Sequence, residues 1–256
     1  MTVGIRQRLE HAGDHTATLT QAQKKNYAEI LSCELAQAFA DRLRPTFTGI
    51  LPDSHGGGQE SRARSSKGYK KLDVNYSTVQ LGLGLGVSIK TINFRDANTR
   101  RYTKNYTRVD GELRAEASDY HERQPYATMV AVIFLPADAA EDAGRVEPSS
   151  FGAAARLFRR RAGRLSPKDS PVLFQRLFIG LYDTTPASFG AVEFVDVLDP
   201  PPKRGRSRRA IGFEALIGEI VSTYDARNDP PFIWDDGTVE TPIPPDAEDA
   251  DSDMDL

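Results

Sequence analysis

The sequence contains very little cysteine and no long apolar run. Cys33 is the only cysteine among 256 residues, which excludes a disulfide framework and a zinc site built from several cysteines. The N-terminal residues lack the apolar core of a signal peptide, and no later stretch approaches the ~18 apolar residues of a membrane span. We therefore expect a cytoplasmic protein with no membrane partner, and we expect Cys33 to be a small, buried helix residue.

Basic residues are missing from the end of the chain. Nine acidic residues and no Lys or Arg follow position 234, so the remainder carries 33 basic and 27 acidic residues, a net charge of +6, although the whole chain has −3. This Pro-rich, acidic end is typical of disorder. We therefore expect a flexible N-terminus over 1–18, a folded domain over 19–234 and a disordered tail over 235–256.

The spacing of the apolar residues predicts a single α/β domain, with a two-domain split as the weaker alternative. Helical spacing predicts helices over 21–44, 109–123, 149–164 and 212–227. Alternation and continuous apolar runs predict strands over 69–78, 79–94, 127–136, 173–185 and 191–198. Residues 46–68 are rich in Gly, Ser and charge and are expected to form a surface loop.

Three polar residues on the first two predicted strands could perform phosphodiester chemistry. Asp73 lies on one predicted strand, and Ser88 and Lys90 share the polar parity of the next. Adjacent strands would place these side chains on one sheet face. There a carboxylate can hold Mg²⁺, while a Lys orients or deprotonates water and offsets phosphate charge.

This stretch resembles the restriction-endonuclease-like superfamily of metal-dependent nucleases, whose motif is an Asp on one strand and an acidic residue, any residue and a Lys on the next. Asp73 and Lys90 match the first and last positions, Glu60 is the candidate for an upstream Glu, and Ser88 departs from the usual acid. The resemblance spans roughly 20–200, with its specific part at 60–90. It implies a mixed central sheet flanked by helices, Mg²⁺ (or Mn²⁺) held by Asp73 and Glu60, and Ser88 in the second ligand place.

The same resemblance implies an endonuclease in bacterial defence, acting as a homodimer or with a defence partner. The residues around the motif favour a nucleic-acid partner, because residues 60–114 carry twelve basic and five acidic side chains. DNA is the expected partner, although DNA and RNA are not distinguished. The candidate phosphate contacts are Arg62, Arg64, Lys70, Lys71, Arg100, Arg101, Lys104 and Arg108.

The alternative function is a catalytically inactive DNA- or protein-binding subunit with the same fold, because Ser88 removes an acid. A purely structural partner in a larger complex is the third possibility. The segment GLGLG at 82–86 is not expected to bind phosphate, because no helix follows it directly. Glu112 and Glu116 are expected to pair with neighbouring arginines, although their helix could face the active cleft. The acidic tail could mimic DNA, or merely solubilise the chain.

Overall fold

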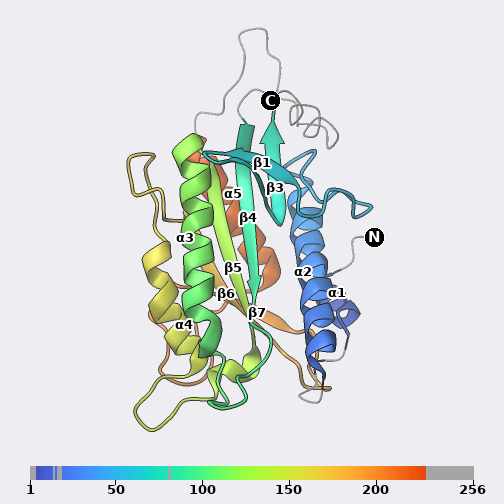
Figure 1. Ribbon diagram of the computed structural model, residues 1–256, viewed down its shortest axis with the longest axis vertical. Coiled ribbons are helices and arrows are strands. Elements are labelled where there is room, and N and C mark those ends of the chain that lie inside the picture. Colours follow the sequence, from blue (N-terminus) through green and yellow to red (C-terminus); the bar gives the residue numbers. More distant parts are fainter. Residues whose placement is uncertain (1–3, 14, 16–18, 80–81, 229–256) are drawn as a thin grey trace.

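A five-stranded mixed sheet forms the centre of the computed structural model, which describes residues 4–13, 15, 19–79 and 82–228 (Figure 1). The strand order is β3-β4-β5-β6-β7, and the three central strands are parallel while each outer strand is antiparallel to its neighbour. The strands are β3 (Val74–Thr78), β4 (Gly82–Thr91), β5 (Thr128–Pro136), β6 (Arg176–Tyr182) and β7 (Val192–Asp196). The predicted disordered tail over 235–256 lies outside the described residues.

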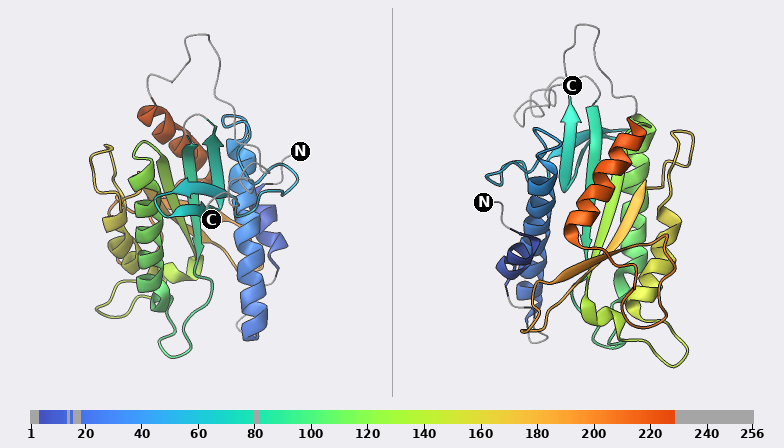
Figure 2. Two further views of the ribbon diagram at one scale, coloured as in Figure 1. Left: turned by 45° about the horizontal axis from the view of Figure 1, so that its top comes forward. Right: turned by 180° about the vertical axis from the view of Figure 1, so that it is seen from behind.

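Helices cover both faces of this sheet, so the prediction of one α/β domain with a flanked mixed sheet is confirmed. The face under α3 and α4 forms one apolar cluster, and the face under α1, α2 and α5 forms another (Figure 2). The helices are α1 (Ile5–His11), α2 (Gln21–Leu43), α3 (Tyr106–Arg123), α4 (Ser150–Phe158) and α5 (Phe213–Arg227). Short 3₁₀ turns are η1 (Thr103–Asn105), η2 (Ala137–Ala140) and η3 (Arg159–Arg161).

Helix α2 begins and ends where the sequence predicts. Thr20 accepts a hydrogen bond from the Gln23 N–H, and the Gln23 side chain accepts one from the Thr20 N–H, which completes a capping box. Such a cap contributes about 1 kcal/mol. Leu31 and Leu35 are fully buried against the sheet, and each contributes roughly 1.5–3 kcal/mol. The helix ends before Pro45, whose ring is incompatible with a continuing helix interior.

Strand β5 is buried along its whole length, as its continuous apolar sequence predicts. The glycine-rich strand β4 pairs with β5, and neighbouring side chains fill the space beside its glycines. A Cβ on Gly86 would lie 2.7 Å from the Met129 sulfur and 3.1 Å from Leu72. The glycines therefore serve close packing within the sheet, in agreement with the expectation that 82–86 is not a phosphate loop.

The strand predicted over 69–78 is two strands in two different sheets. Residues Gly68–Lys71 form β2, which pairs with β1 (Arg62–Ser65) in a separate antiparallel hairpin. The prediction of a surface loop over 46–68 is therefore wrong at its end. Asp73 lies in the break between β2 and β3 and not on a strand, because the chain leaves the hairpin there to enter the central sheet.

The N-terminal segment was predicted to be flexible, and this is wrong for Ile5–His11, which form α1. Leu9 is buried against α2, and the Arg8 guanidinium bonds Glu34 at 2.9 Å and Asp41 at 3.1 Å. Both contacts are long-range, which explains why the local sequence did not reveal them. None of the helices in the described part of the chain combines the length and apolar character that a bilayer crossing requires.

Candidate functional site

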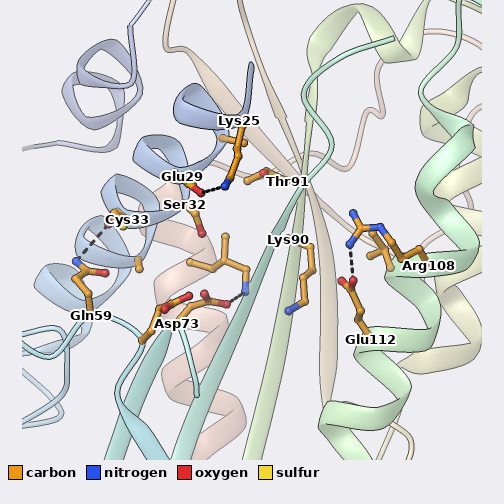
Figure 3. A pocket seen from close by; sticks show the side chains of 15 residues that line it. Lys25, Glu29, Ser32, Cys33, Gln59, Asp73, Lys90, Thr91, Arg108 and Glu112 are labelled. Carbon is orange, nitrogen blue, oxygen red and sulfur yellow. Dashed lines mark hydrogen bonds and ion pairs between the residues drawn. The ribbon is translucent and has the colours of Figure 1, made fainter. Parts of the chain in front are cut away.

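A cleft of about 490 Å³ lies between α2 and the first turns of α3, with the second half of β4 as its floor (Figure 3). It forms because β4 extends past the start of β3: Val74 pairs with Val87, so the last residues of β4 lie beyond that strand. The cleft brings together Asp73, Lys90 and Glu60, which the sequence singled out, although Glu60 comes from the loop before β1.

Asp73 is held at the floor by the backbone of the neighbouring strand. Its Oδ2 accepts a hydrogen bond of 2.6 Å from the Ile89 N–H. Burial raises the pKa of this carboxyl to about 6, and repulsion from Glu116 and Glu60 adds to the rise, while Lys90 and the Ile89 N–H oppose it. The one lysine near Asp73 is therefore not enough to offset burial and the two nearby carboxylates, and the charged form of Asp73 is disfavoured.

Lys90 and Ser88 both contact Glu116, a residue of α3. The Lys90 Nζ lies 3.1 Å from Glu116 Oε2, and the Ser88 hydroxyl donates to the same oxygen at 3.0 Å. Burial would lower the pKa of Lys90, but Glu116 and Asp73 outweigh it and raise that pKa above its ordinary value. Lys90 is consequently a charged ammonium at neutral pH, which can orient and donate but cannot accept a proton.

Glu116 is the residue that sequence reasoning undervalued. Ser88 is buried, and α3 brings the Glu116 carboxylate to its hydroxyl. The signal available in the sequence was a row of polar residues at four-residue spacing, Arg108, Glu112 and Glu116, on one side of a helix. Only the packing of α3 over β4 shows that Arg108 and Glu112 line the cleft and that Glu116 contacts Lys90.

Glu60 lies at the rim and not among the buried groups. Its carboxylate bonds the Lys71 ammonium at 2.7 Å, and both side chains are about 60% exposed. Its backbone has φ 51°, a left-handed conformation that costs a non-glycine residue about 1 kcal/mol or more. Glu60 influences Asp73 through charge, since it contributes to the raised pKa of that carboxyl.

The two walls of the cleft carry one exposed ion pair each. Lys25 and Glu29 lie 3.6 Å apart on α2, and Arg108 bonds Glu112 on α3. Cys33 also lines the cleft and is exposed, so the expectation of a buried cysteine is wrong. Partial burial of the sulfur is the largest cause that raises the thiol pKa, and the nearby carboxylates raise it further. The raised pKa makes this cysteine a weak nucleophile.

The eight candidate phosphate contacts divide into two groups. Arg62, Arg64, Lys70 and Lys71 lie on the β1–β2 hairpin, and Arg108 lines the cleft. In contrast, Arg101 bonds Glu147 at 2.6 Å and Lys104 bonds Asp96 at 2.7 Å. Arg100, directly before Arg101, has φ 58°. Ion pairs within the segment over 95–105 and with Glu147 therefore hold this loop in place.

Metal-ligating side chains are sparse in the described part of the chain, which contains no group of three or more His, Cys, Asp and Glu residues placed to hold one ion. His121 is buried, burial lowers its pKa to about 4, and its Nδ1 lies 3.1 Å from the Pro171 carbonyl. It is a neutral packing residue at the end of α3. Of the carboxylates near Lys90, Asp73 lines the cleft with it and Glu116 contacts it from α3.

The comparisons with known proteins add no relative to this geometry: no protein-family model, no curated protein and no solved structure matches the chain.

Proposed function

We propose that this protein is a metal-dependent endonuclease acting on DNA, with Asp73, Lys90 and Glu116 as its catalytic centre. The observation that carries the proposal is that Asp73 and Lys90 line one cleft, while Glu116 contacts both the Lys90 ammonium and the Ser88 hydroxyl. A partly buried carboxyl with its pKa raised to about 6 is the kind of group that functional sites maintain.

The carboxylates of this centre fit a magnesium ion. Mg²⁺ is usually held by one or two carboxylates, with water and phosphate oxygens completing its shell, so it does not need three protein ligands. Asp73 and Glu116 would hold it, and the repulsion that raises the Asp73 pKa is the kind that a cation relieves. When bound, the ion polarises the phosphate and lowers the pKa of a water.

The side chains of the chain itself perform distinct tasks in this proposal. Lys90, charged at neutral pH, donates hydrogen bonds to a phosphate oxygen and orients the attacking water. Ser88 fixes one oxygen of Glu116 through its hydroxyl. The Ile89 N–H fixes one oxygen of Asp73. Glu60 acts from the rim through charge, which is a smaller role than the resemblance implies.

Cleavage of supercoiled plasmid with Mg²⁺ or Mn²⁺ tests the proposal. We expect the wild-type protein to nick or linearise DNA, and we expect Lys90→Gln and Glu116→Gln each to lower the initial rate by about 100-fold or more. Arg145→Gln, on the exposed loop after η2, is the matched control for loss of one charge and should retain the rate. Wild-type activity that survives in both site variants would exclude this centre.

An inactive binding subunit is the second candidate. Two observations favour it: Ser88 is neutral, and the described residues contain no three-ligand metal group. It predicts salt-sensitive DNA binding with no metal-dependent product. The plasmid assay combined with a binding measurement at two salt concentrations separates the two functions.

The wider setting is also a proposal. A role in bacterial defence, a cytoplasmic location and assembly as a homodimer or with a defence partner rest on the family resemblance and on the single cysteine. Cutting both strands of a duplex commonly uses two active sites, so size-exclusion chromatography with light scattering in the presence of DNA is the direct measurement of assembly.

A further inference from the structure

A second hollow, of about 640 Å³, lies beside the cleft, between the β1–β2 hairpin and α3. Glu112 lines both hollows, and Glu116, which contacts Lys90 at the cleft floor, also lines the second one. Because residues four apart stand on one side of a helix, α3 forms a continuous wall from the cleft to the hairpin. The two hollows are therefore neighbouring parts of one surface.

The hairpin is fixed firmly on α3. The Ser66 N–H donates to the Asp119 carbonyl at 2.7 Å, and the Tyr120 hydroxyl donates to the Lys70 carbonyl at 2.7 Å. The buried Asp119 carboxylate pairs with Lys67 at 2.7 Å and Lys70 at 3.3 Å. The second hollow thus has a preorganised wall, which lowers the entropic cost of binding.

The chemistry of this hollow matches an unpaired nucleotide. Tyr69 lines it, and Arg64 holds the ring in place, with its guanidinium 5.3 Å from the ring centroid and its Nε donating to the Tyr69 hydroxyl at 2.8 Å. Arg62, Lys70 and Lys71 line the hollow on the hairpin side, where residues 62–71 contain five basic and no acidic residue, and Glu112, Glu116 and Asp119 line it on the α3 side. An aromatic face beside basic side chains is how proteins bind single strands.

The depth of the cleft favours a single strand over a duplex. Lys90, at the floor, has a side chain that is 23% exposed, whereas Lys25 and Glu29 on one wall are 79% and 64% exposed. A flexible strand can thread its phosphate between walls to a recessed lysine, while a stiff duplex keeps its phosphates on a broad convex surface. Both hollows fall within the roughly 300–1,000 Å³ that holds one small ligand, a space suited to single nucleotides.

We propose that the substrate of this centre is single-stranded DNA, with a base stacked on Tyr69 in the hairpin hollow and a neighbouring phosphate at Lys90 in the cleft. The inference rests on the proposed nuclease function for the role of Lys90. Tyr69 is a binding residue here, and Lys70 and Lys71 exchange part of their pairing with Asp119 and Glu60 for phosphate contacts.

Fluorescence anisotropy in EDTA measures this substrate class without any cleavage. The probes are a labelled single-stranded DNA oligonucleotide, the duplex of the same sequence and the single-stranded RNA of the same sequence. We expect the single-stranded DNA to bind about tenfold or more tightly than the duplex. Equal or tighter binding of the duplex overturns the proposal, and tighter binding of the RNA overturns the choice of DNA.

Variants of Tyr69 test the stacking contact. Tyr69→Leu should weaken single-strand binding by about tenfold, because a stacked base contributes about 1–3 kcal/mol. Tyr69→Phe keeps the ring, loses only the hydroxyl that Arg64 contacts, and should bind nearly as well as wild type. Equal affinities of the Leu, Phe and wild-type proteins overturn the subsite. Thermal unfolding of each variant ensures that only folded protein is compared.

Failure of this inference and failure of the nuclease proposal give different results. Metal-dependent cutting of duplex and single strands at equal rates, with no effect of Tyr69→Leu, refutes the substrate class and leaves the nuclease intact. Tight, Tyr69-dependent single-strand binding with no cleavage under any metal refutes the nuclease and leaves the binding site intact.

Discussion

Two aspartates of this protein experience opposite electrostatics. Asp110 is buried at 6% exposure, yet its pKa is lowered, because Arg161 and Arg160 outweigh the effect of burial. The Arg161 Nε lies 2.8 Å from Asp110 Oδ1, and the Arg160 Nη2 lies 2.7 Å from Oδ2. Asp73 has one lysine against two carboxylates, and burial raises its pKa to about 6. Burial is the largest cause at both carboxyls, and two arginines outweigh it at Asp110 whereas one lysine does not at Asp73.

The largest expected difference between the two aspartates is in activity. Asp73→Asn should lower the rate of metal-dependent DNA cleavage by about 100-fold or more, because it removes a charged group at the proposed centre. Asp110→Asn, measured at a temperature where it remains folded, should retain a rate within about threefold of wild type. Plasmid-nicking kinetics provide both values. Similar losses in the two variants would remove the functional distinction.

The next largest expected effect is on stability, and here the substitution at Asp110 should be the costly one. Asp110→Asn should lower the free energy of unfolding by about 3 kcal/mol, since it leaves two guanidinium groups without their shared carboxylate. Asp199→Asn breaks the more exposed pair with Arg209 and should cost less than about 1 kcal/mol. Urea unfolding at neutral pH measures both. A small loss in Asp110→Asn would show that its ion pairs are not needed for the fold.

A smaller, pH-dependent effect is expected at Asp73. Because its folded pKa is raised from 3.8 to about 6, the stabilisation that the protonated form provides is present at low pH and is lost as the pH rises through about 6. Asp73→Asn should therefore raise the free energy of unfolding by about 1–3 kcal/mol at pH 8 and by much less at pH 4. Urea unfolding in EDTA at these two pH values measures it, and the opposite pH trend would contradict the raised pKa.

The smallest expected effect is at the basic segment over 95–105, in comparison with the basic β1–β2 hairpin. Lys104 already pairs with Asp96 at 2.7 Å, so Lys104→Gln should change DNA affinity by less than about twofold. Lys70→Gln, on the hairpin, should weaken it by more and should reduce its salt dependence. Anisotropy titrations at two salt concentrations compare them. Equal losses would place DNA on both basic regions.

Much of the fold follows from local sequence, and the exceptions have physical causes. The capping box of Thr20 and Gln23 and the continuous apolar run of β5 are local signals, and both elements appear where expected. The break at Asp73 was missed, because an alternating pattern does not show that a chain passes from one sheet to another. Helix α1 was missed because its stability comes from contacts of Arg8 and Leu9 with α2.

The candidate site likewise contains residues that the sequence identifies and residues that only tertiary packing reveals. Asp73 and Lys90 were identified on the expectation that both lie on strands, which holds for Lys90 but not for Asp73. Glu116 could not be assigned, because its role depends on the packing of α3 over β4. The basic residues looked alike in sequence, yet only tertiary contacts show that Arg101 braces a loop while Lys70 borders a hollow.

The sequence by itself determined most of the helices, the buried strands and the residue types that could act on a phosphodiester, because propensity, capping and apolar periodicity depend on near neighbours. The tertiary structure decided which charges are satisfied. An ion pair such as Arg161 with Asp110 joins residues 51 positions apart. Electrostatic interaction depends on distance through space and on burial, which the order of residues alone does not specify.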